Sequence, residues 1–148
     1  MSSERSHPET EVGAEADTVY ARIGGADGVR RLVDRFYALM DSLPQARGVR
    51  RMHPPELDRS ADSLFKFLSG WFGGPPLYMR ERGHPRLRMR HAPFAIGAAE
   101  RDAWMQCMHQ ALDEQVADPP LRAAVHSAFS AMADHMINRA PGDQDAPV

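Results

Sequence analysis

A histidine at the end of a helix that cannot continue is the residue best placed to do chemistry in this sequence. Pro93 has no N–H to donate and disfavours helical dihedral angles at the residue before it, so a short helix from about Arg86 must end near His91. In that last turn, the ring nitrogen nearest the backbone can donate to a free carbonyl group, which we expect to be that of Leu87. The lone pair of the outer ring nitrogen then points outward, as it must to reach a metal ion.

Two aromatic side chains could add hydrogen-bond donors to such a site. Trp104 lies thirteen residues after His91, and the pair suggests a cofactor held between two helices. Tyr37 places a hydroxyl among apolar neighbours, which costs roughly 1–3 kcal/mol unless the hydroxyl finds a partner. Taken alone, however, a tryptophan or tyrosine on an apolar stripe is more often a core residue, and a lone histidine is more often structural than a ligand.

Three separated segments resemble the group II truncated haemoglobins, the small bacterial globins with a two-over-two arrangement of helices. They are Trp71–Tyr78, His84–Phe94 and Glu100–Trp104, and they occur in the order and at the spacing of that family. The resemblance extends over about residues 18–139. It implies an all-α truncated globin fold around haem b (iron protoporphyrin IX), with His91 as the axial ligand of the iron.

The same resemblance implies roles for residues on the distal side of the haem, where a small ligand binds. The hydroxyl of Tyr37 and the indole N–H of Trp104 would donate to that ligand. Ser60 stands where many globins have a distal histidine and would leave the entrance small. Leu64, one turn further on, would face the same side.

His53 departs from the family pattern, which usually has Phe or Tyr before the proline that is here Pro54. It could stack in place of that aromatic residue with its tip exposed, or it could be a third polar group of the distal pocket or a transient second axial ligand. We favour stacking, because the pair Pro54–Pro55 stiffens the chain and hinders the movement that ligation would need.

The remaining residues implied to contact the haem are Phe67, Leu68, Tyr78, Arg86, Arg88 and Phe94. Phe67 and Leu68 would pack against the ring, and Phe94 would lie beneath it. Arg88 is the favoured partner of a haem propionate, because it stands three residues before the histidine on nearly the same helical face. Tyr78 and Arg86 are weaker candidates for that role, and five arginines between residues 80 and 90 are otherwise a solvated basic run.

The implied function is reversible binding of O2, CO and NO to ferrous haem. Donors from Tyr37 and Trp104 would stabilise the partial negative charge on bound O2 and slow its release. Slow release suits the reaction of O2 with NO to give nitrate (an NO dioxygenase), or peroxidase-like chemistry, with an electron-donor reductase as partner, better than oxygen transport. Two alternatives stay open: a single-domain haem gas sensor that acts through a separate partner, and a haem-free helical interaction protein.

The elements that must position these residues are all predicted to be helices, because apolar residues recur at helical spacing and no segment alternates with period two for long. Helices are expected at about residues 17–23, 26–42, 58–72 and 86–91, and the third of these ends before Gly73–Gly74. Two more are expected, one after Gly97 and one after Asp118, which is the predicted N-cap because it precedes Pro119. Residues 73–86 contain three prolines and three glycines and are expected to be mostly loop.

Length and composition fit a single cytoplasmic domain. With 148 residues the chain can bury one core, and we expect a globin domain over residues 17–139 between disordered tails at 1–16 and 140–148. Cys107 is the only cysteine, which excludes an internal disulfide and a cysteine-based zinc cluster. The net charge of −2 argues against a nucleic-acid binder, and no segment predicts a membrane span or a signal peptide. The oligomeric state cannot be inferred from these patterns.

Overall fold

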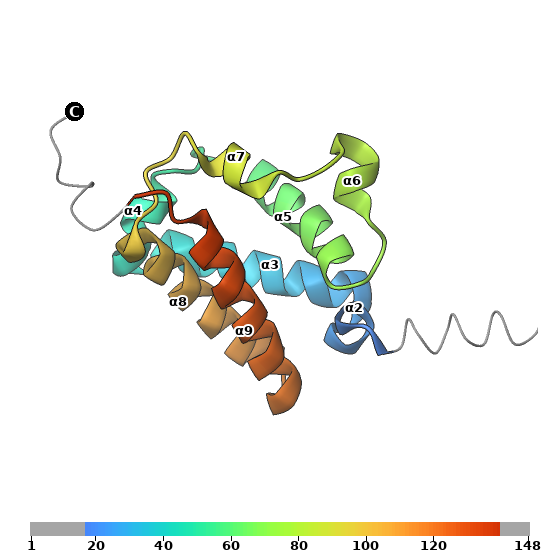
Figure 1. The fold of residues 1–148 in the computed structure, drawn as a ribbon. Coiled ribbons are helices and arrows are strands. Elements are labelled where there is room, and N and C mark those ends of the chain that lie inside the picture. The colour runs from blue at the N-terminus through green and yellow to red at the C-terminus, as the bar shows by residue number, and fades with distance from the viewer. Residues whose placement is uncertain (1–16, 140–148) are drawn as a thin grey trace, which may run out of the picture.

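The computed structural model describes residues 17–139, and every regular element in that range is a helix, as predicted (Figure 1). The tails expected at 1–16 and 140–148 lie outside the described residues. The helices are α2 (Val19–Ile23), α3 (Gly25–Ser42), the 3-10 helix η1 (Pro44–Ala46), α4 (Arg47–Arg50), α5 (Asp58–Trp71), α6 (Leu77–Arg82), α7 (Leu87–His91), α8 (Ala98–Gln115) and α9 (Pro119–Met136).

Two pairs of long helices form the core. α3 packs on both α5 and α8, and α8 packs on α9, so that α3 and α5 form one pair and α8 and α9 the other (Figure 1). The residues with no exposed surface in this interface are Val29, Leu32, Val33, Phe36, Leu68, Cys107, Met108, Ala111, Leu112 and Phe129. The apolar stripes seen in the sequence therefore face one another, and their burial supplies the main driving force for folding.

The corner between α2 and α3 lies where the sequence predicts it. Gly24 ends α2 in the left-handed region, with φ of 114°, and α3 begins at Gly25. Gly28, one turn into α3, lets the two helices approach closely, because a Cβ atom there would lie 2.1 Å from the carbonyl oxygen of Ile23. This contact sets the direction of α3, which carries Tyr37.

At two places the structure adds detail that the sequence did not predict. Residues 73–86 contain the short helix α6, because the prolines precede Leu77 and no glycine or proline follows before Gly83, so the breakers bound a helix instead of preventing one. Asp118 does stand at the N-cap of α9, but its side chain makes no capping bond. Its carboxylate pairs instead with Arg22, at 3.0 Å.

In the described part of the chain, no helix is long and apolar enough to cross a lipid bilayer.

Candidate functional site

The helix α7 ends at His91 and orients its imidazole as the sequence predicts. Nδ1 of His91 lies 2.7 Å from the carbonyl oxygen of Leu87, one turn earlier, and donates to it. This bond fixes the neutral tautomer and leaves the lone pair of Nε2 available to a ligand. Among residues 17–139 no group of three or more His, Cys, Asp or Glu side chains could hold a metal ion.

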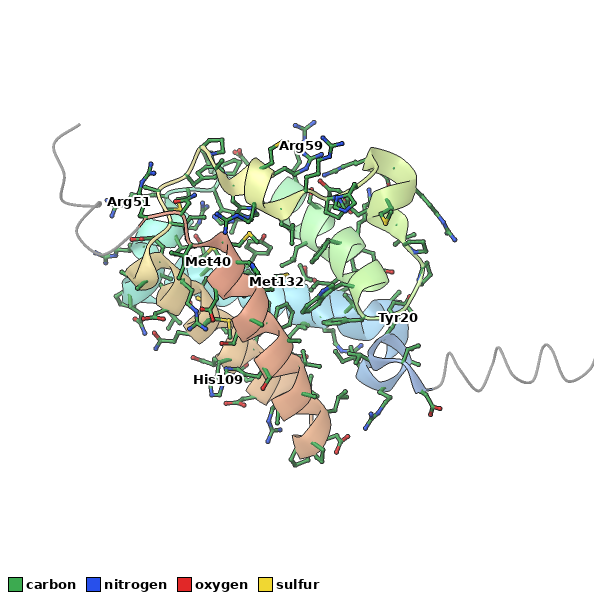
Figure 2. All side chains as sticks on the ribbon, in the orientation of Figure 1. Tyr20, Met40, Arg51, Arg59, His109 and Met132 are labelled. Carbon is green, nitrogen blue, oxygen red and sulfur yellow. The ribbon has the colours of Figure 1, made fainter. Side chains whose placement is uncertain are left out.

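A cavity of about 320 Å³ lies in front of His91, between α3, α5, α8 and α9. Eight of the twelve residues predicted from the sequence line it: Tyr37, His53, Ser60, Leu64, Phe67, His91, Phe94 and Trp104. The rest of its wall is mainly apolar, and includes Val49, Met52, Leu87, Ile96, Met132, Ala133 and Met136, with Glu100 and Arg101 at one end. Met132 of α9, labelled in Figure 2, is one of these wall residues.

Tyr37 brings a protonated hydroxyl to the cavity. Its hydroxyl donates to the carbonyl oxygen of Ser60, but at 3.4 Å this is a long and weak bond. Burial of the side chain raises the pKa of Tyr37 above its usual value, so the hydroxyl keeps its proton. The ring is held edge to face against Phe36 and His53, with centroid separations of 4.9 and 5.7 Å. Tyr37 is thus held in place by two rings, and its one proton is only weakly engaged.

Trp104 enters the cavity from α8. Its ring packs against Phe36 at 5.0 Å and against Phe129 at 5.8 Å, so the indole is held in one orientation by two buried aromatic residues. Because Phe36 contacts both Tyr37 and Trp104, one buried ring aligns both predicted donors.

His53 fills the position of the expected aromatic residue by packing on Tyr37. Its Nδ1 lies 3.0 Å from the carbonyl oxygen of Val49 and donates to it in the neutral tautomer, which leaves Nε2 for the cavity. Burial lowers the pKa of His53, the bond to Val49 opposes this shift, and the charge of Arg50 lowers the pKa further. His53 is therefore neutral near pH 7.

A second hollow adjoins the cavity on the side of α6 and α7 and is basic. It shares His91, Tyr37 and other residues with the cavity and is also lined by Tyr78, as predicted, and by Arg59 and Arg90. Arg59 lies at the start of α5 (Figure 2). Sequence reasoning missed both arginines, although each directly precedes a predicted site residue. Guanidinium groups here would pair with carboxylates of a cofactor.

Three residues that were predicted to contact the cofactor, Leu68, Arg86 and Arg88, line neither the cavity nor the basic hollow. Leu68 is fully buried in the helical core, because it lies about 100° around α5 from its neighbour Phe67, which does line the cavity. Arg86 stands before α7 as its left-handed N-cap, with φ of 48°. The side chain of Arg88 donates to the carbonyl oxygen of His135 at 2.8 Å, towards α9 and away from the basic hollow.

The donor set of the two hollows fits haem. A macrocycle that supplies four ligands to its iron needs only one more from the protein, and His91 offers one imidazole nitrogen. The apolar wall suits the face of the ring, and the basic hollow suits its propionates. Tyr37 and Trp104 place hydrogen-bond donors in the same cavity as His91.

Comparison with known proteins gives concordant results. The model of the family described as bacterial-like globin matches residues 18–138. Group 2 truncated hemoglobin YjbI of Bacillus subtilis (strain 168) is 35% identical over 128 residues, which cover 86% of this chain and 94% of that protein.

Solved structures agree in fold as well as in sequence. The cold-adapted truncated hemoglobin of the Antarctic marine bacterium Pseudoalteromonas haloplanktis TAC125 is 44% identical, with a TM-score of 0.83 over 84% of this chain and 100% of that one. The truncated oxygen-avid haemoglobin of Bacillus subtilis is 36% identical, with a TM-score of 0.75 over 82% of this chain and 100% of that one.

Proposed function

Because the chain belongs to the bacterial-like globin family, as a group II truncated haemoglobin, we propose that it holds haem b through His91 and converts O2 and NO to nitrate. A haem globin binds diatomic ligands such as O2, and this membership excludes the haem-free interaction protein. The observation that carries the proposal is that two fixed donors, Tyr37 and Trp104, share the cavity with the open nitrogen of His91. One relative is described as oxygen-avid. A protein that retains O2 in this way is better suited to use O2 as a reactant.

When bound, haem supplies a ferrous iron with one open position for O2, CO or NO, and the single electron with which O2 and NO combine to nitrate. The side chains do the rest. The proton of Tyr37 can turn from the carbonyl of Ser60 to a ligand at small cost, because the bond that it leaves is weak. In an apolar cavity both donors act at low dielectric constant, so they favour a ligand with partial negative charge.

One electron is consumed for each nitrate formed, so we propose that a separate electron-donor reductase restores the ferrous state. Arg59 and Arg90 are proposed to bind the haem propionates, with the hydroxyl of Tyr78 beside them. A cytoplasmic location, where such donors occur, stays a prediction.

The test of this function is rapid mixing of the O2-loaded ferrous protein with NO. We expect one nitrate per haem and a ferric product within the mixing experiment. If NO instead replaces O2 and no nitrate forms, the protein only binds these gases, and the gas sensor becomes the better hypothesis. Ferric protein mixed with hydrogen peroxide and a phenolic reductant measures the peroxidase-like alternative separately.

His53 is proposed to pack on Tyr37 without binding the iron, and its titration provides a test. Since its pKa is lowered in the folded protein, the unfolded chain takes up this proton first as the pH falls. Stability due to the neutral ring is therefore complete above about pH 6.5, the ordinary value, and is lost as the pH falls towards the lower folded pKa. Between pH 7 and pH 5, wild type should lose more unfolding free energy in urea than His53→Phe does.

The ferric spectrum checks the same proposal directly. At pH 7 His53 is neutral and so would be able to bind the iron. If it does not, as we propose, the spectra of wild type and His53→Phe should contain the same amount of six-coordinate low-spin component. A low-spin component that disappears in His53→Phe but persists in Tyr37→Phe would show that His53 binds the iron.

A further inference from the structure

The helices α7 and α9 cap one another at their C-termini. Arg88 of α7 donates to the carbonyl oxygen of His135, in the last turn of α9. In return Asn138, just beyond α9, donates to the carbonyl oxygen of His91, the last residue of α7, at 3.2 Å. The last carbonyl groups of a helix have no partner within it. Each helix donates to a carbonyl group at the end of the other, and that of His91 also accepts from the backbone N–H of Phe94, at 3.0 Å.

Asn138 also holds the segment that follows α7. Its side-chain nitrogen donates to the carbonyl oxygen of Phe94 at 2.8 Å, and its side-chain oxygen accepts from the N–H of Ile96 at 2.9 Å. The backbone N–H groups of Asn138 and Arg139 both donate to the carbonyl oxygen of Ile96, at 2.8 and 3.1 Å. One amide side chain and two backbone groups thus fix the chain from residue 91 to residue 96.

α7 needs such support, because it is too short to be stable alone. It has five residues, its N-cap Arg86 makes no side-chain capping bond, and none of its residues is fully buried. Nucleating a helix costs more than one turn of hydrogen bonds returns, so a helix of this length takes its place from tertiary contacts. Here α9 and the residues just after it provide them.

We propose that Asn138 is a positioning residue for His91: by fixing the end of α7, it sets how the imidazole meets the haem iron. The inference rests on the proposed axial role of His91. Asn138 does not line the cavity, so it acts only through the backbone of residues 91–96. The sequence offers no sign of this role, because Asn138 lies 47 residues after His91.

The experiment compares three variants of the haem-loaded full chain. Asn138→Ala removes all three side-chain bonds, whereas Asn138→Asp keeps an acceptor for the N–H of Ile96 but cannot donate to His91 or Phe94. Asp134→Ala is the matched control, since it removes an ion pair with Arg101 in the last turn of α9, close in sequence to Asn138, and Asp134 makes no bond to residues 91–96. For each protein we would measure the iron–histidine stretching band by resonance Raman spectroscopy and the rate of haem transfer to an apoglobin acceptor.

We expect Asn138→Ala to shift or broaden the iron–histidine band and to release haem about ten-fold faster, as the loss of three hydrogen bonds would predict. Asn138→Asp should move the band while its unfolding temperature stays closer to wild type, which a purely structural role would not produce. Asp134→Ala should leave the band in place. An unchanged band and haem-release rate in both Asn138 variants would overturn the proposal, as would equal changes in Asp134→Ala.

Two further measurements distinguish a failure of this inference from a failure of the proposed function. If His91→Gly retains the wild-type band, the axial assignment itself is wrong, whatever Asn138 does. If Asn138→Ala does not fold, hydrogen exchange of the haem-free wild type still decides. The amides of Ile96, Asn138 and Arg139 should then exchange slowly and at similar rates. Rapid exchange of the Ile96 amide would show that Asn138 does not hold residues 91–96.

Discussion

His91→Gly is expected to lose stable haem binding, the largest effect of any single substitution in this protein. Nε2 of His91 is the protein's only proposed bond to the iron, and the bond from its Nδ1 to Leu87 holds the ring ready to make it. Purified His91→Gly should lack the Soret absorption of wild type, and imidazole added during reconstitution should restore a histidine-like spectrum, because it can occupy the space of the missing ring.

The control is His109→Ala, which removes an exposed histidine of α8 (labelled in Figure 2) and should retain haem fully. An ordinary ferrous spectrum in His91→Gly without imidazole would contradict the axial assignment. If both variants lost haem, the defect would be one of folding, and circular dichroism of the haem-free proteins would show it.

Tyr37→Phe and Trp104→Phe should each release O2 about ten-fold faster or more than wild type. A hydrogen bond to a charged acceptor is worth about 1.5–3 kcal/mol, and O2 carries more negative charge when bound than CO does. Stopped-flow displacement of O2 by CO measures the rate, and the release of CO should change less. Phe keeps the ring of Tyr37 against Phe36, and at Trp104 it keeps an aromatic side chain that is smaller than the indole.

The double variant separates the two donors from each other. Because both donate to one small ligand and both rings pack on Phe36, the two effects should combine to less than their sum. Wild-type O2 release in both single variants would mean that neither residue is a distal donor, even if haem is retained.

Local chemistry made part of the site readable from sequence. Pro93 ends α7, and the geometry of a last helical turn brings the ring nitrogen of His91 to the carbonyl group four residues earlier, so the bond to Leu87 follows from five neighbouring residues. The buried stripes of α3 and α8 follow from periodicity in the same way. The positions of Tyr37 and Trp104 in one cavity came from family resemblance, since spacing within a helix does not show which helices meet.

The directions of the long side chains could not be predicted. Arg88 is three residues before His91 on α7, as expected, but an arginine reaches several ångströms from its backbone, and its guanidinium donates to the carbonyl oxygen of His135 on α9. Arg90 of α7 and Arg59 of α5 line the basic hollow, although they lie 31 residues apart in the sequence. Such contacts depend on tertiary structure, where sequence patterns carry little information.

The mutual capping of α7 and α9 has a consequence for the order of events during biosynthesis. Asn138 comes after every other residue of the site along the chain, and a ribosome makes the chain from the N-terminus. While the nascent chain ends before Asn138, His91 is already made, but the end of α7 still lacks the side chain that ties residues 91–96 to the end of α9. Firm capture of the cofactor would therefore be one of the final steps of maturation, after most of the helical core has already formed.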